Sequence, residues 1–201
     1  MNVARGAYHH GDLRAALLRE AAQMIAQNGV GSVTMRALGD RLRVSRAALY
    51  RHFPDKNALL VAVAADGFAQ LRAYVMDRDP PAERVSLERF KQMGDAYVRF
   101  AIENPAHYRL MYGREALTRE DYPELREAAN ALFDDLVELF RTLQAVGKVK
   151  RQNPESLAYV GWSAVHGLAS LVIERQIRAD ADIEALTRLT TTTVLDGMRR
   201  R

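Results

Sequence analysis

Residues 34–54 read TMRALGDRLRVSRAALYRHFP, and this stretch decides the fold. It contains two short helical patterns, residues 34–42 and 45–52, and each begins at a hydroxyl-bearing residue of the type that caps helix N-termini. Only two residues connect the patterns. A connection of this length is typical of a helix-turn-helix unit, in which the second helix enters the major groove of DNA.

The outward side of the second pattern has the chemistry of a DNA contact. Leu49, together with Val44, can face a helical core. The residues left facing outward are Arg46, Ala47, Tyr50 and Arg51. Arginine can donate two hydrogen bonds to guanine, alanine permits close approach of the backbone, and tyrosine can reach a phosphate or a thymine methyl group. The spacing alone leaves a second interpretation open, in which two packing helices present a solvated basic face.

The positive charge of the chain is concentrated near its N-terminus. The 201 residues are 48% hydrophobic and 27% charged, which is typical of a soluble globular protein, and the formal net charge is +4. Residues 1–60 contain nine lysines and arginines against four acidic residues, whereas the remainder contains twenty against twenty-one. A basic head on a nearly neutral body favours a polyanionic partner for the head alone.

Several functional classes lack the residues that they need. The chain has no cysteine, which excludes disulfides, cysteine nucleophiles and thiolate zinc sites. It contains no glycine-rich phosphate loop, nucleophile elbow or paired-histidine zinc motif, so we expect no catalytic residues, no metal, no cofactor and no enzymatic activity. No apolar run reaches the roughly 18 residues that cross a bilayer, and residues 1–5 lack the apolar stretch of a signal peptide. We therefore expect a cytoplasmic protein without membrane contact.

The rest of the chain predicts helices. Apolar residues recur at helical spacing, and sustained alternation of apolar and polar residues is absent. We expect an all-α fold, with a three-helix head that contains the helix-turn-helix (residues 1–55) and a helical-bundle body (residues 56–201). Pro80 and Pro81 should interrupt regular structure. The expected helices cover about residues 13–28, 34–42, 45–52, 55–75, 83–103, 108–111, 122–146, 154–177 and 182–201.

A specific family signature surrounds the second helical pattern. Residues 44–59 match Val-Ser-x-x-x-Leu-Tyr-x-His-Phe-x-x-Lys-x-x-Leu, and residues 12–60 closely resemble the DNA-binding head of the TetR family of transcriptional regulators. The resemblance implies a regulator that binds double-stranded DNA. The residues expected to bind DNA are Thr34, Arg36, Arg43, Ser45, Arg46, Ala47, Tyr50, His52 and Lys56.

Arg43 departs from this family pattern, because the family usually has glycine in the turn. A left-handed turn conformation would cost a residue other than glycine about 1 kcal/mol, so we expect the turn to be shaped differently. The side chain of Arg43 is either a solvent-exposed turn residue or a phosphate contact.

A second, weaker resemblance lies in the body. Residues 104–112 read NPAHYRLMY and residues 162–167 read WSAVHG, which resembles the TetR subgroup whose C-terminal domain carries a Trp-His-Gly signature. Trp162 and His166 lie four residues apart and therefore share one helical face. They are either a hydrogen-bonded core histidine packed on an indole or part of a ligand pocket.

The body contains an excess of large, adaptable side chains with few polar groups, a mixture that suits a ligand cavity and also an ordinary core. The family resemblance favours a cavity for a small apolar or aromatic effector. The residues expected to line it are Phe90, Met93, Tyr97, Phe100, Tyr108, Met111, Phe133, Trp162 and His166.

The helix expected at residues 154–177 is apolar on two sides, which predicts burial on two sides. One side can face the body's own core and the other a second subunit, and the resemblance implies pairing through the last two helices. The expected interface residues are Leu168, Leu171, Leu186, Thr190 and Val194.

The function that these patterns predict is a homodimeric repressor, which a small effector releases from a palindromic operator. Coupling of effector to operator through the helix at residues 55–75 is implied by the resemblance. Within the same class, an activator or a nucleoid-type binder without effector stays open. The alternative from another class is a helical-bundle enzyme or adaptor whose basic head binds another polyanion.

Overall fold

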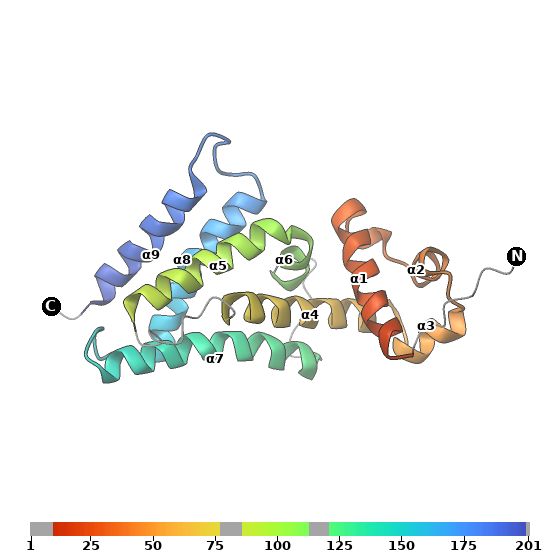
Figure 1. The fold of residues 1–201 in the computed structure, drawn as a ribbon, viewed down its shortest axis with the longest axis horizontal. Coiled ribbons are helices and arrows are strands. Elements are labelled where there is room, and N and C mark those ends of the chain that lie inside the picture. Colours follow the sequence, from red (N-terminus) through yellow and green to blue (C-terminus); the bar gives the residue numbers. More distant parts are fainter. Residues whose placement is uncertain (1–9, 77–85, 113–120, 200–201) are drawn as a thin grey trace, which may run out of the picture. The chain divides into compact units, whose positions relative to one another are not determined.

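The computed structural model of the chain describes residues 10–76, 86–112 and 121–199 (Figure 1). Within these residues the regular elements are helical, apart from an isolated bridge between Val149 and Arg199, so the predicted all-α fold is confirmed. Pro80 and Pro81 lie outside the described residues. The elements are α1 (His10–Asn28), the 3-10 turn η1 (Val30–Ser32), α2 (Met35–Leu42), α3 (Arg46–His52), α4 (Lys56–Met76), α5 (Leu87–Glu103), α6 (Pro105–Tyr112), α7 (Pro123–Ala145), α8 (Pro154–Ile173) and α9 (Ile183–Met198).

The chain divides into two compact units. Residues 1–67 and 106–125 form the N-terminal unit, and residues 68–105 and 126–201 form the C-terminal unit. The division falls inside α4, after Gly67. The boundary expected between residues 55 and 56 separates the first three helices from α4, whereas these units place the first half of α4 and all of α6 with the head.

The core of the head is formed where α1, α2 and α3 meet. Leu17 of α1, Leu38 of α2 and Leu49 of α3 are fully buried. An ion pair joins Nε of Arg41 to Oε1 of Glu20 at 2.7 Å and so links α2 to α1. These contacts give the two short helices the tertiary support that isolated helices of this length lack.

Helix α6 packs closely on α4 within the N-terminal unit. A Cβ added to Gly67 would lie 2.8 Å from Sδ of Met111 and 3.4 Å from Cδ2 of His107, so a side chain at position 67 would require Met111 to move. Burial lowers the pKa of His107, and the nearby carboxylate of Asp66 opposes that shift. His107 is therefore neutral at pH 7.

The core of the C-terminal unit lies where α5 packs against α8 and α9. An added Cβ would lie 2.5 Å from Cγ2 of Thr191 at Gly94 and 2.7 Å from Cε2 of Phe90 at Gly161. The two glycines therefore permit close contact of α5 with α9 and of α8 with α5. Residue types larger than glycine would force these helices apart.

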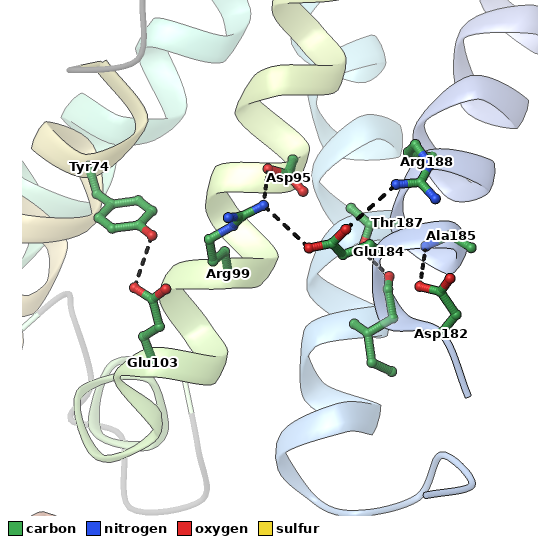
Figure 2. Close-up of polar contacts among 10 residues, drawn as sticks. Tyr74, Asp95, Arg99, Glu103, Asp182, Glu184, Ala185, Thr187 and Arg188 are labelled. Atoms are coloured by element: carbon green, nitrogen blue, oxygen red, sulfur yellow. Dashed lines mark hydrogen bonds and ion pairs between the residues drawn. The ribbon is translucent and has the colours of Figure 1, made fainter. Parts of the chain in front are cut away.

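Exposed polar contacts link α5 to α4 and to α9 (Figure 2). Arg99 of α5 pairs with Asp95 at 3.1 Å and with Glu184 of α9 at 3.8 Å, and Tyr74 of α4 donates to Glu103 of α5 at 2.9 Å. Exposed ion pairs contribute only about 0–1 kcal/mol each. Apolar packing, not this surface network, therefore supplies most of the stability of the unit.

The C-terminal end of α4 is held by a buried cation. Arg89 of α5 is 4% exposed and donates from Nη1 to the carbonyl oxygen of Val75 at 3.3 Å. A positive charge at a helix C-terminus is favourable because it meets the negative end of the helix dipole. Earlier on α4, Arg72 forms an ion pair with Asp135 of α7 at 2.6 Å, and this partner raises the pKa of Arg72.

Most helix ends fall within three residues of the positions that the sequence predicts. The exceptions are α5, which begins at Leu87, four residues after the expected position, and α8. Helix α8 ends at Ile173, four residues before the expected position. Arg175 takes a left-handed conformation with φ of 54°, and the N–H of Gln176 donates to the carbonyl oxygen of Leu171 at 2.8 Å. These bonds satisfy carbonyl groups in the last turn and stop the helix.

By length and composition alone, α4 and α8 could each cross a membrane. Core helices of soluble proteins pass the same test, and 56% of the apolar window of α4 is buried in the chain. The value for α8 is 39%, because one side of this helix is apolar and exposed.

Candidate nucleic-acid interface

Helices α2 and α3 form the helix-turn-helix that the sequence predicts. The side-chain oxygen of Thr34 accepts the N–H of Ala37 at 3.1 Å, and that of Ser45 accepts the N–H of Ala48 at 3.2 Å. Both predicted N-caps are therefore confirmed. Each cap fixes the start of a helix that is too short to be stable alone.

The two helices approach closely at Gly39. A Cβ added there would lie 2.9 Å from Cδ1 of Leu49 and 3.3 Å from the carbonyl oxygen of Val44. Leu49 is fully buried. The contact holds one side of α3 against α2 and leaves its other side to solvent.

The expectation of a differently shaped turn is wrong. Arg43 has φ of 54° and ψ of 41°, which is the left-handed conformation that glycine adopts most readily. The N–H of Val44 donates to the carbonyl oxygen of Gly39 at 3.0 Å. The N–H of Arg43 donates to the carbonyl oxygen of Asp40 at 3.4 Å. These two bonds and the contact at Gly39 impose the left-handed turn on an arginine.

The residues expected to bind DNA form a largely exposed surface on α2, α3 and the turn. His52 and Lys56 are half-buried, and Tyr50 is 50% exposed. The other exposed residues of the set are Thr34, Arg36, Arg43, Ser45, Arg46 and Ala47. All seven exposed members are therefore accessible to a duplex.

The cations of this surface fall into two groups. Arg36 lies 3.8 Å from Asp40 within α2, and Arg41 is paired with Glu20. By contrast, the side chains of Arg43, Arg46 and Arg51 make no hydrogen bond or ion pair with any residue that the structure describes. The positive charge without a neutralising partner is thus concentrated on α3 and on the turn that precedes it. Arg51 was expected to point outward, and it belongs to this group.

Lys56 already has an intramolecular partner. Its Nζ donates to the carbonyl oxygen of Val30 in η1 at 3.1 Å, and this bond ties the start of α4 to the 3-10 turn. An ammonium group has three donors, so two are left for other acceptors. Replacing Lys56 would therefore affect the packing of the head in addition to any phosphate contact.

Three residues of the expected effector site form one hydrogen-bonded group in the C-terminal unit. Nε1 of Trp162 donates to the Tyr97 oxygen at 3.2 Å, and this oxygen lies 2.9 Å from Nδ1 of His166. The Tyr97 hydroxyl can donate its own proton to Nδ1, an arrangement that places the proton of a neutral His166 on Nε2. We call Tyr97, Trp162 and His166 the polar trio.

Aromatic rings extend the polar trio toward the surface. The ring centroid of Phe133 lies 4.5 Å from that of Tyr159 and 6.0 Å from that of Trp162. Tyr159 is half exposed. Tyr159 is not among the residues expected to line the effector site, because its contact with Phe133 depends on how α7 and α8 pack.

The remaining residues of the expected effector site are buried, and they belong to both units. Tyr108 and Met111 belong to α6 in the N-terminal unit. Phe90 packs on Phe140 with ring centroids 5.4 Å apart and fills the space above Gly161. The other buried members are Met93 and Phe100.

The residues expected at a subunit interface lie in different surroundings. Leu168 is 9% exposed and belongs to the core of its own chain, whereas Leu171 is 49% exposed. Leu186, Thr190 and Val194 are half-buried on α9. The exposed side of α8 also contains Val160, which is 53% exposed.

Among the described residues, no group of three or more histidine, aspartate or glutamate side chains could hold a metal ion.

Comparison with known families assigns both parts of the chain. Residues 17–63 match the family described as bacterial regulatory proteins of the tetR family, and residues 90–194 match the tetracyclin repressor-like C-terminal domain. The second match alone covers more than half of the chain. The chain belongs to the TetR family. It is therefore a DNA-binding transcriptional regulator, and the match over residues 17–63 includes α2, α3 and their turn.

Individual relatives agree with this assignment. The uncharacterized HTH-type transcriptional regulator YobS of Bacillus subtilis is 33% identical over 88 residues, 44% of this chain and 45% of that protein. The chain thus aligns with slightly less than half of that relative. The nucleoid occlusion factor SlmA of Aliivibrio fischeri is 27% identical over 142 residues, 68% of this chain and 69% of SlmA.

A solved structure resembles nearly the whole TetR-family chain. It is a protein of unknown function from Rhodococcus sp. RHA1, with 30% identity, a TM-score of 0.87, and coverage of 98% of this chain and 100% of that one. The likeness supports the fold of both units and says nothing about a ligand.

Proposed function

We propose that this TetR-family regulator is a cytoplasmic homodimeric repressor that binds a palindromic operator and is released by a small apolar or aromatic effector. The observation that carries the proposal is the surface of α3 and its preceding turn, where Arg43, Arg46 and Arg51 are exposed and no described residue neutralises them. Two copies related by a two-fold axis would present two recognition helices to half-sites about 34–36 Å apart.

The proposed dimer uses the exposed apolar sides of α8 and α9, which we call the seam. On α8 the seam contains Val160, Ala164, Gly167 and Leu171, spaced as one helical stripe, and on α9 it contains Leu186, Leu189, Thr190, Thr193 and Gly197. Added Cβ atoms at Gly167 and Gly197 would meet nothing within 4 Å in the same chain. Small residues with open space beside them permit close approach of a second pair of helices.

The sequence-specific contact is predicted to depend on Arg46. Arg46→Ala should weaken operator binding by about 1–3 kcal/mol and relax the preference at one base pair, because an exposed arginine on a recognition helix can donate twice to a guanine. The operator can be selected from a random pool of duplexes by repeated binding, and affinities can then be measured by gel shift.

Arg36→Ala is the matched control for this change. It removes an exposed arginine from α2, where the side chain lies near Asp40, and should reduce binding to operator and random duplexes by similar factors. Equal losses on both kinds of DNA for Arg46→Ala would reduce Arg46 to a phosphate contact. Failure of the unchanged protein to select any sequence would contradict the regulator function itself.

The effector part of the proposal is supported by the polar trio and the rings of Phe133 and Tyr159 beside it. These residues combine apolar rings with a few groups that can orient a ligand, which is typical of small-molecule sites. An aromatic compound with a hydrogen-bond acceptor suits both the apolar rings and the groups that can orient a ligand. Its binding must favour the state with low DNA affinity if it is to release the operator.

A thermal-melting screen of aromatic carboxylic acids and phenols tests this part. A ligand present at about 100 times its Kd should stabilise the protein by about 2.7 kcal/mol and raise the melting temperature by about 5–10 °C. Tyr97→Phe should reduce the rise, whereas Tyr74→Phe, which removes a hydroxyl bonded to Glu103, should not. If no compound raises the melting temperature and releases DNA, the protein acts without an effector of this class.

One observation favours a second candidate function. SlmA, a relative over 68% of this chain, is named for nucleoid occlusion. A nucleoid-type binder would occupy many sites spread along the chromosome, whereas a repressor would occupy few sites near promoters. Sequencing of the genomic fragments that the protein retains distinguishes the two.

A further inference from the structure

Two arginines of this chain occupy left-handed positions at helix C-termini. Arg43 follows α2 and Arg175 follows α8, and both have φ of 54°. In each case two backbone bonds close the helix in the same pattern. The N–H of the arginine donates to the carbonyl oxygen three residues earlier, and the N–H of the next residue donates to the carbonyl oxygen five residues earlier. Gly147 ends α7 with this same pair of bonds and has φ of 71°. The part of the chain that the structure describes thus contains one such end built with glycine and two built with arginine.

The left-handed conformation is unfavourable for arginine, because its Cβ crowds the following carbonyl group. Backbone strain of this kind persists where the surrounding structure imposes it, and it often occurs at functional sites. At Arg43 the contact of Gly39 with Leu49 and Val44 imposes the conformation. Glycine would accept the same turn without strain, so the side chain of Arg43 needs a separate explanation.

The surroundings of Arg43 indicate a polyanion contact. It stands two residues before Ser45, the N-cap of α3, and its side chain is exposed without a hydrogen bond or ion pair to any described residue. The next arginine along the chain, Arg46, lies in the first turn of α3. The turn therefore extends the unneutralised positive charge of the recognition helix toward its N-terminal side.

We propose that Arg43 binds a DNA phosphate beside the recognition helix, and that the chain retains it at a cost in stability. This inference rests on the proposed function, since it requires that α3 enter the major groove. A phosphate contact positions the helix and contributes equally on all sequences, so Arg43 should act on affinity and its salt dependence and leave sequence preference unchanged.

The test compares Arg43→Gly with Arg175→Gly, a change of the same residue at the same φ in a turn of the C-terminal unit. Each change should raise the melting temperature by about 2 °C, because glycine relieves the left-handed strain. Only Arg43→Gly should weaken binding to a random-sequence duplex of about 30 base pairs, by about eightfold per lost contact at about 0.1 M salt. The slope of log affinity against log salt should fall by about 0.9 per lost contact.

Arg43→Lys keeps the charge and should preserve most of the salt slope, which separates a phosphate contact from a purely structural role. An unchanged slope and affinity in Arg43→Gly would overturn the proposal and make Arg43 a helix end alone. Loss of DNA affinity in Arg175→Gly to the same degree would also overturn it. If the unchanged protein binds no duplex at any salt concentration, the DNA-binding function fails together with this proposal.

Discussion

Replacement of Leu171 by glutamate should separate the proposed dimer into monomers at micromolar concentration. Leu171 is 49% exposed in the single chain and is the last residue of the seam on α8. In a dimer paired through the seam, Leu171→Glu would bury a carboxylate among apolar side chains without a partner, which costs several kcal/mol. Light scattering and analytical ultracentrifugation measure the change directly.

Ile102→Glu is the matched control, because Ile102 is 43% exposed on α5 and lies outside the seam. This variant should remain a dimer. Leu168 is unsuitable as a test position, since its burial in the core of its own chain means that Leu168→Glu would disturb folding before assembly. A monomeric unchanged protein at micromolar concentration would remove the basis for a palindromic operator.

Gly94→Val should destabilise the protein by about 3 kcal/mol, because it overpacks the contact of α5 with α9. A Cβ at position 94 would already lie 2.5 Å from Cγ2 of Thr191 and 3.2 Å from Cγ1 of Val165, and valine adds two further methyl groups. Both neighbours are β-branched and cannot move aside by a simple change of rotamer. Urea denaturation followed by circular dichroism gives the change in the free energy of unfolding.

Gly167→Ala provides the opposite case, and it is best measured in the monomeric Leu171→Glu variant. Its Cβ would meet no atom of the same chain within 4 Å, so the higher helix propensity of alanine should stabilise the monomer by up to about 1 kcal/mol. When Leu171 is retained, the methyl group that Gly167→Ala adds should weaken the dimer.

Equal stability of Gly94→Val and its parent would show that α5 and α9 are less closely packed than the structure places them.

Local features of the head and the helix starts could be predicted from sequence. Asp55 accepts the N–H of Ala58 at 2.8 Å, and Asn153 and Asp182 likewise cap α8 and α9 as their positions in the sequence suggest. Capping requires only residues within about three positions of each other, so the sequence contains the whole interaction. The early end of α8 could not be foreseen, since arginine gives no sign that it will adopt a left-handed conformation at position 175.

Features that depend on tertiary packing were beyond the reach of the sequence. Leu168 and Leu171 are both leucines on α8, and only the positions of the neighbouring helices decide that one is in the core and the other is exposed. Lys56 reaches a carbonyl group 26 residues earlier in the chain, and Tyr97 meets Trp162 across 65 residues. The helical period identifies apolar sides, but it does not say which neighbour covers each of them.

The packing of α5 has a consequence for how the protein is made. Its close partners, Gly161 of α8 and Thr191 of α9, are synthesised long after α5 itself, which ends at residue 103, whereas α9 ends at residue 198. At about 5–20 residues per second, the apolar side of α5 waits about 5–20 s for its last partner. The C-terminal unit therefore completes its core only after α9 has been synthesised, and until then the apolar side of α5 is exposed to association with other apolar surfaces.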